Sequence, residues 1–293
     1  MNLSRHRRKA ICACVAGTLA GILAAVTAPG ASAAGPTVGA GTVPAIASLN
    51  GSLEDCFVDN NGTLDTSAGG PSGFGALGGC SVAGFNGNMY VAWTDPSTRQ
   101  VAYATMDFST GVLNGIIRPE NVFSPFAPSL AAWNNNLYIA WTGTDGRLNV
   151  RDLTTVQQAT FEASSHAPAL TGGPGYLEIA WVGSTNIHLN VAALSAALSE
   201  TCKETFAQSS VMTPGLTTLN GRPYLSWIGE DVFSHINLIA DTTATNGCAF
   251  PDTEGKLGDA YESQTTAGLS PSNGAVWMIW GGETDGALNI AQS

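Results

Sequence analysis

The chain has 293 residues, with 11 lysines and arginines against 22 aspartates and glutamates, and its formal net charge is −11. A nucleic-acid surface requires clustered basic residues, and beyond the first ten residues the sequence has no such cluster. Attraction to anionic lipid is disfavoured for the same reason. The thin, even spread of charge is typical of a soluble exported protein.

The first 33 residues have the pattern of a secretory signal peptide. The basic start is made of Arg5, Arg7, Arg8 and Lys9. The apolar stretch 11–26 follows, and Ala31-Ser32-Ala33 fits a small-residue cleavage site. We therefore expect a secreted, extracellular protein whose mature part, residues 34–293, forms a single domain. No later stretch is long and apolar enough to span a bilayer.

An apolar run that ends in an aromatic residue recurs six times along the chain. The clearest copy, residues 137–150, reads LYIAWTGTDGRLNV, and most copies continue through a polar turn to Leu-Asn or Ile-Asn. The aromatic anchors are Phe57, Trp93, Trp141, Trp181, Trp227 and Trp280. They lie 36 to 53 residues apart. A repeat of this length indicates one supersecondary unit per copy.

The third copy predicts four short strands. Ser129, Leu130 and Ala131 form the first, and residues 137–142 alternate with period 2, as in a second strand. Thr144-Asp145-Gly146 is a hairpin turn, because Asp-Gly tolerates positive φ. Residues 148–153 and 156–162 complete the unit. Four strands per copy, without a helical period, predict an all-β propeller with six four-stranded blades, or five if the first copy is only a closing strand.

The last copy ends at Ser293, directly after its third strand. Its fourth strand must then come from elsewhere, and the segment 37–43 is a candidate. We expect this N-terminal strand to close the ring, because closure removes the exposed edges of an open sheet.

Four cysteines follow the signal peptide: Cys56, Cys80, Cys202 and Cys248. An even number in an exported chain suggests two disulfides, for which three pairings are possible. Cys56–Cys80 and Cys202–Cys248 are favoured because each would join neighbouring repeats. No Cys-x-x-Cys or close His pair exists, and the acidic loop 59–65 lacks the later Glu of an EF-hand, so we expect no metal site.

The tryptophan anchors are expected to pack between neighbouring blades, because large aromatic side chains dominate core energetics. The alternative, stacking on a sugar, is the less favoured interpretation.

The polar turns contain a second repeated set of residues. Its members are Asp145, Asn149, Asn190, Asn237, Asp285 and Asn289, with Asn186, Glu230 and Asp231 in the same turns. Turn chemistry alone explains Asp and Asn at such positions. Repeated at one rim of a rigid ring, however, they also provide the paired donors and acceptors that sugar hydroxyls need. We name them as candidate ligand-binding residues.

The residue types three positions before each anchor are unexpected, because two of them are glutamates inside an otherwise apolar strand. They are Glu54, Tyr90, Tyr138, Glu178, Tyr224 and Trp277. Glu178 beside Tyr138 or Tyr224 is a possible nucleophile–base pair for glycosyl transfer. The plainer interpretation is a glutamate at the mouth of a strand that reaches water.

The string APSLAAWNNNLYIAWTGTDGRLNV resembles the tandem repeats of secreted bacterial sialidase-like propeller proteins, and the resemblance covers most of residues 44–293. It implies a six-bladed propeller of carbohydrate-linked ancestry. Sialidases use an arginine triad, a Tyr–Glu pair and an Asp, whereas only Arg99, Arg118, Arg147, Arg151 and Arg222 follow the signal peptide here. So few cations leave little means of clamping an anionic sugar. Fungal fucose-binding lectins, which are also six-bladed and bind between blades, are a second architectural likeness.

These observations favour a secreted, non-catalytic, lectin-like propeller that binds a glycan or polysaccharide and needs no cofactor. One alternative is a sialidase-like glycoside hydrolase that uses Glu178. The other is an extracellular protein-interaction scaffold without a small ligand.

Overall fold

The computed structural model describes residues 36–66, 69–229, 234–241, 248–251, 255, 257, 261–263 and 265–292. The expected signal peptide and the turn residues Glu230 and Asp231 lie outside these ranges. The described residues form β-strands and no α-helix. None of them belongs to a helix that is long and apolar enough to cross a membrane.

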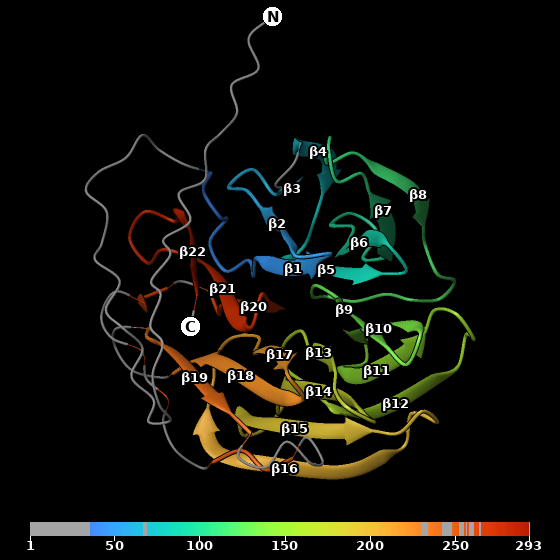
Figure 1. Ribbon diagram of the computed structural model, residues 1–293, viewed down its shortest axis with the longest axis vertical. Helices are drawn as coiled ribbons and strands as arrows, with labels where there is room; N and C mark the ends of the chain where they lie inside the picture. Colours follow the sequence, from blue (N-terminus) through green and yellow to red (C-terminus); the bar gives the residue numbers. More distant parts are fainter. Residues whose placement is uncertain are drawn as a thin grey trace, which may run out of the picture.

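The strands form six antiparallel sheets arranged as the blades of a ring (Figure 1). Blade 1 is β1 (Ala45–Leu49), β2 (Ser52–Val58), β3 (Thr63–Thr66) and β4 (Gly70–Gly75). Blade 2 is β5 (Cys80–Phe85), β6 (Asn88–Thr94), β7 (Val101–Met106) and β8 (Leu113–Ile117). Blade 3 is β9 (Ser129–Trp133), β10 (Asn136–Thr142), β11 (Arg147–Asp152) and β12 (Gln158–Ala163).

The remaining blades follow in chain order. Blade 4 is β13 (Ala169–Gly172), β14 (Leu177–Val182), β15 (His188–Leu194) and β16 (Glu200–Ser209). Blade 5 shows β17 (Gly215–Leu219), β18 (Arg222–Ile228) and β19 (Ile236–Ala240), and blade 6 shows β20 (Gly268–Ser272), β21 (Ala275–Gly281) and β22 (Leu288–Gln292). The predicted six-bladed propeller is confirmed. The five-bladed alternative is wrong, because the first copy forms a complete blade.

The third blade matches its predicted strands to within one or two residues at each end, and the difference with a clear local cause is in the outer strand. β12 begins at Gln158 rather than at Val156. Val156 has a φ of 66° and donates its N–H to Asp152 O at 2.9 Å, so it still belongs to the turn. A β-branched residue in the left-handed region is unusual, which is why the sequence did not predict this turn.

Residues 36–38 lie beside β22 of the last blade. Thr37 forms an isolated antiparallel bridge with Ala287. Val38 N donates to Gly286 O at 2.8 Å, and Leu288 N donates to Pro36 O at 3.0 Å. These contacts fall short of a continuous strand, so the closing strand stays a prediction.

The innermost strand of every blade lines a central cavity of about 90 Å³. Pro44, Pro128, Pro168 and Pro214 contribute to this lining, together with mostly small and aliphatic residues. Serine hydroxyls connect neighbouring inner strands: Ser81 Oγ accepts the N–H of Leu130 at 2.8 Å, and Ser129 Oγ accepts that of Leu170 at 3.0 Å. The cavity at the centre of the ring is therefore small, and hydrogen bonds join the inner strands around it.

The five tryptophan anchors are buried, with exposed fractions of 1% to 5%. Each lies in an apolar cluster shared with the preceding blade. Trp93 packs with Val58 of blade 1, and its ring centroid is 5.5 Å from that of Phe74. Trp141 packs with Ala92 of blade 2. The same arrangement recurs for Trp181, Trp227 and Trp280. The predicted packing between blades is confirmed.

Both favoured disulfides are present. Cys56–Cys80 joins β2 to β5, and so links blades 1 and 2. Cys202–Cys248 joins β16 of blade 4 to the segment 248–251, which follows β19 of blade 5.

We predict that Trp141→Ala lowers the free energy of unfolding by about 3–5 kcal/mol, because it removes the largest side chain of the blade 2–blade 3 junction. Chemical denaturation monitored by circular dichroism measures the change. Val112→Ala, at a position that is 54% exposed, is the control and should be close to neutral. Equal stability of Trp141→Ala and the wild-type protein would contradict the role of the indole.

Candidate functional site

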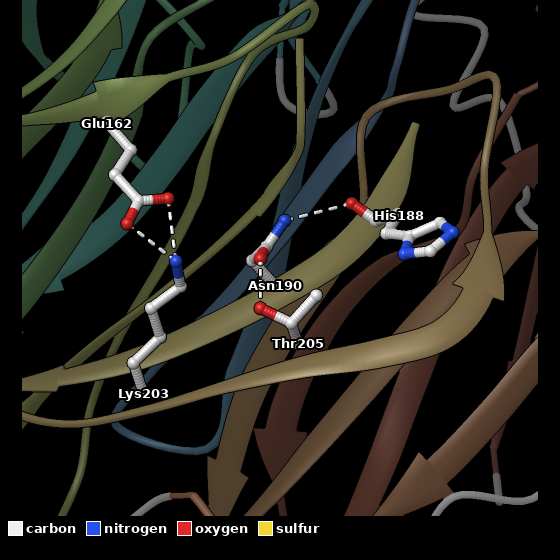
Figure 2. Close-up of polar contacts among 5 residues, drawn as sticks. All are labelled: Glu162, His188, Asn190, Lys203 and Thr205. Carbon is white, nitrogen blue, oxygen red and sulfur yellow. Dashed lines mark hydrogen bonds and ion pairs between the residues drawn. The ribbon is translucent and has the colours of Figure 1, made fainter. Parts of the chain in front are cut away.

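The predicted asparagines of blades 3 and 4 bond to the backbone of their own strand and to a threonine of the outer strand. In blade 3, Asn149 Nδ2 donates to Arg147 O at 2.9 Å, and its Oδ1 accepts the hydroxyl of Thr160 at 2.8 Å. In blade 4, Asn190 makes the same bonds to His188 O at 2.9 Å and with Thr205 at 2.7 Å (Figure 2).

The same Nδ2 bond recurs in the last two blades. Asn237 donates to His235 O at 3.4 Å, and Asn289 donates to Ala287 O at 2.8 Å. In blades 3 to 6 the asparagine amide therefore bonds to the backbone carbonyl two residues earlier, where the third strand begins, and we call this bond the asparagine staple.

The aspartates of these turns are also engaged with the backbone. Asp145 Oδ1 accepts the N–H of Arg147 at 3.0 Å, and Asp285 Oδ1 accepts that of Ala287 at 2.9 Å. A Cβ at Gly143 or Gly282 would lie 2.6 Å from the nearby Asp Oδ1, so glycine is required before each turn. These bonds support the structural interpretation of the turns, and ligand binding by the six predicted residues stays a prediction.

The threonines that complete two of the staples were not predicted. Thr160 follows Asn149 by 11 residues, whereas Thr205 follows Asn190 by 15 residues. The outer strands differ in length and register, so no fixed spacing pointed to these partners.

Glu178 is the second residue of β14 and is completely buried. The expectation that it reaches water is wrong. Burial and the charge of Asp241 raise its pKa well above the ordinary value. Neither predicted tyrosine meets it: Tyr138 packs in the blade 3–blade 4 cluster and Tyr224 in the blade 5–blade 6 cluster. The tyrosine beside Glu178 is instead Tyr176, whose pKa is raised by burial, then by Glu178 and Asp241.

An accessible polar pair bridges the outer strands of blades 3 and 4. Lys203 Nζ lies 2.6 Å from each carboxylate oxygen of Glu162, and it sits 5.5 Å from the centre of the Trp181 ring. The side chains are 24% and 56% exposed, respectively. Figure 2 shows this pair beside the Asn190 staple. We call Lys203, Glu162 and Trp181 the blade 3–4 junction group.

This group is not a repeated feature. Lys203 pairs with Ala192 two positions along β15 from Asn190, and the matching position of blade 3, opposite Arg151, is Gln158. Sequence reasoning missed the group because its two charged residues are 41 positions apart, on strands with no strong alternation.

The described residues contain no group of three or more His, Cys, Asp or Glu side chains that could hold a metal ion. In the acidic loop, Asp59 Oδ1 accepts the N–H groups of Asn61 and Thr63 at 2.9 and 2.8 Å. Burial alone would raise the Asp59 pKa, but these bonds, together with one from the Asn61 side chain, lower it overall.

No protein-family model and no curated protein matches the sequence. Solved structures match the fold. A six-bladed fucose-recognising lectin from Aleuria aurantia is 12% identical, with 88% of this chain and 93% of that chain covered and a TM-score of 0.62. The lectin SapL1, solved with α-methyl fucoside, is 13% identical over 88% and 94% of the chains, with a TM-score of 0.61.

A protein of unknown function from Dyadobacter fermentans is 11% identical over 87% and 95% of the chains, with a TM-score of 0.59. Identities this low show the six-bladed fold alone. The resemblance to sialidase-like repeats therefore stays a prediction.

Asp65 of blade 1 occupies the position of the staple asparagines. It pairs with Phe57 as Asn149 pairs with Trp141. A carboxylate cannot donate the Nδ2 bond, and Asp65 Oδ1 has no hydrogen-bond partner among the described residues. Burial, followed by the charge of Asp59, raises the Asp65 pKa to about 6.

We predict that Asp65→Asn stabilises the protein near neutral pH and has little effect in acid. A raised folded-state pKa means that stability is complete below the unfolded value and is lost as the pH rises through about 6. The gain at about pH 7.5 should be about 1 kcal/mol after solvent screening. The reciprocal variant Asn149→Asp should lose stability with the same pH dependence. A gain of equal size at about pH 4 would contradict the assignment.

Proposed function

We propose that the protein is a secreted, non-catalytic, lectin-like propeller that binds carbohydrate at the blade 3–4 junction group. The observation that carries this proposal is the exposed Lys203–Glu162 pair, held against the Trp181 ring by two adjoining blades. The fold likeness to lectins that recognise fucose supports it. Residues 1–33 would act as the signal peptide and residues 34–293 as the mature domain. The two disulfides support an extracellular location.

The chemistry of the pair suits a neutral saccharide. The Lys203 ammonium offers three donors and the Glu162 carboxylate only acceptors, which together match vicinal hydroxyl groups. Their charges cancel, so the pair gives no preference for an anionic sugar. The methylene stem of Lys203 and the edge of the junction provide apolar surface for a sugar ring.

The repeated turns support fewer equivalent sites than their number suggests. Asn149, Asn190 and Asn237 are 5% to 8% exposed, and their amides already serve the hairpins. A saccharide that contacts Asp145, Asp285 or Asn289 would be a weaker, secondary ligand. Several weak sites on one rim would add avidity if the target presents matching epitopes.

We predict that Lys203→Ala weakens binding to the recognised glycan by at least about tenfold, as expected for the loss of a charged hydrogen-bond donor. A glycan array identifies the ligand, and titration calorimetry measures the dissociation constants. Gln158→Ala, the matching change in blade 3, is the control and should leave binding unchanged. The proposal fails if the wild-type protein binds no glycan, or if both variants bind like wild type.

A further inference from the structure

Arg151 departs from the repeat in the third strand of blade 3. It lies two residues after Asn149 and pairs with Ile139, which lies two residues before the Trp141 anchor. The matching positions of four other blades hold buried apolar residues: Ala104, Ala192, Ile239 and Ala291. Arg151 is instead half-buried. A charged side chain therefore occupies a column that is apolar in those blades.

Tyr103 of blade 2 is a second departure at the same junction. It pairs with Ala92 on β6, and so lies on the side of blade 2 that packs against Trp141. The matching residues of blades 3 and 4, Val150 and Val191, are completely buried. Tyr103 is half-buried and adds an aromatic ring and a hydroxyl at this position.

Arg151 and Tyr103 approach the blade 2–3 junction from its two sides. Their strand partners, Ile139 and Ala92, pack in the same cluster, and each side chain lies on the face of its sheet that carries its partner. Burial raises the pKa of Tyr103, as does Tyr90, whereas the Arg151 guanidinium acts in the opposite direction. These effects are expected of neighbouring groups.

Two further aromatic side chains complete the group. Phe85 and Tyr90 are half-buried, pack against the same cluster, and have ring centroids 6.1 Å apart. We call Phe85, Tyr90, Tyr103 and Arg151 the blade 2–3 junction group.

The polar atoms of this group have no hydrogen-bond or ion-pair partner among the described residues. This holds for the Arg151 guanidinium and for the hydroxyls of Tyr90 and Tyr103. The other arginines that follow residue 33 differ: Arg99, Arg118 and Arg147 are exposed, and Arg222 donates to Asp241 O at 2.6 Å. A half-buried charge loses hydration, and in Arg151 no protein group replaces it.

We propose that the blade 2–3 junction group binds a carboxylated sugar, of the uronic acid class. The Arg151 fork matches a carboxylate with two parallel N–H bonds. The hydroxyls of Tyr90 and Tyr103 pair with sugar hydroxyls, and their rings and that of Phe85 offer apolar surface to the sugar ring. Three aromatic rings around one arginine favour a ligand with a ring as well as a charge over an inorganic anion.

This site is independent of the proposed neutral-sugar site. At the blade 3–4 junction group the charge of Lys203 is cancelled by Glu162, whereas Arg151 keeps its charge. The two sites lie on opposite sides of blade 3 and take different classes of sugar. One chain could in this way contact both kinds of residue in a mixed polysaccharide.

Titration calorimetry with paired probes tests the site. The methyl glycosides of glucuronic, galacturonic and mannuronic acid are compared with those of glucose, galactose and mannose. We expect at least one uronide to bind at least about tenfold more tightly than its neutral counterpart, as a bidentate charged contact implies. Arg151→Ala should remove this preference. It should also fold, because alanine is the residue at the matching positions of blades 2, 4 and 6.

Arg147→Ala, on the same strand, is the control: it removes the same charge and should leave uronide binding unchanged. Arg151→Lys keeps the charge but not the planar fork, and should weaken uronide binding by several-fold. Circular dichroism checks that each variant is folded.

The inference is overturned if no uronide is preferred over its neutral counterpart, or if folded Arg151→Ala binds uronides like wild type. Acetate or phosphate binding as tightly as the uronide would also overturn it, because the fork would then attract any anion. Loss of uronide binding in Lys203→Ala would assign these sugars to the blade 3–4 junction group instead. Binding of neutral glycans there is tested separately, so either proposal can fail alone.

Discussion

The indole wedged between adjoining sheets is the constraint on which the ring depends. In the sequence Ala-Trp, successive side chains point to opposite faces of a strand, so the tryptophan faces the preceding blade and the alanine the following one. Ala92 accordingly packs with Trp141, Ala140 with Trp181, and Ala180 with Trp227. These three junctions thus each join the tryptophan of one blade to an alanine of its neighbour, whereas Ser226 and Ile279 take the place of the alanine in blades 5 and 6. The dipeptide encodes both halves of the contact, which lets one repeated unit close on itself.

The asparagine staples place a second constraint on the blades. The amides of Asn149 and Asn190 bond to the backbone at the start of their own strands and reach the outer strand through threonine. Polar groups that serve the fold in this way are poorly placed to serve a ligand as well. Function is therefore expected where the chain departs from its repeat, and Lys203 is such a departure, because its counterpart in blade 3 is Gln158. A ring of similar blades can in this way carry a single asymmetric site.

The features that could be predicted from the sequence are those that repeat with a regular period along it. Alternation around Trp141 defined the central strands, and the distribution of cysteines over neighbouring copies favoured the observed disulfides. Residue pairs across a junction were harder to predict. Glu178 and Tyr138 occupy the same column, three residues before an anchor, so each faces the following blade. Members of one column point the same way around the ring and do not meet. The outer strands, which position Glu162, have too little alternation for their register to be predicted.

The two disulfides occur where the repeat is least regular. Cys56–Cys80 joins blade 1, in which Asp55 and Asp65 are buried at positions that other blades fill with apolar or amide side chains. Cys202–Cys248 spans the junction that contains Glu178 and Asp241. A buried carboxylate destabilises the sheet around it, whereas a cross-link restricts the unfolded chain and typically contributes about 2–4 kcal/mol. The covalent bonds therefore offset acid burial at those blades. The junction of Trp141, by contrast, is held by packing and by hydrogen bonds such as that from Leu130 N to Ser81 Oγ.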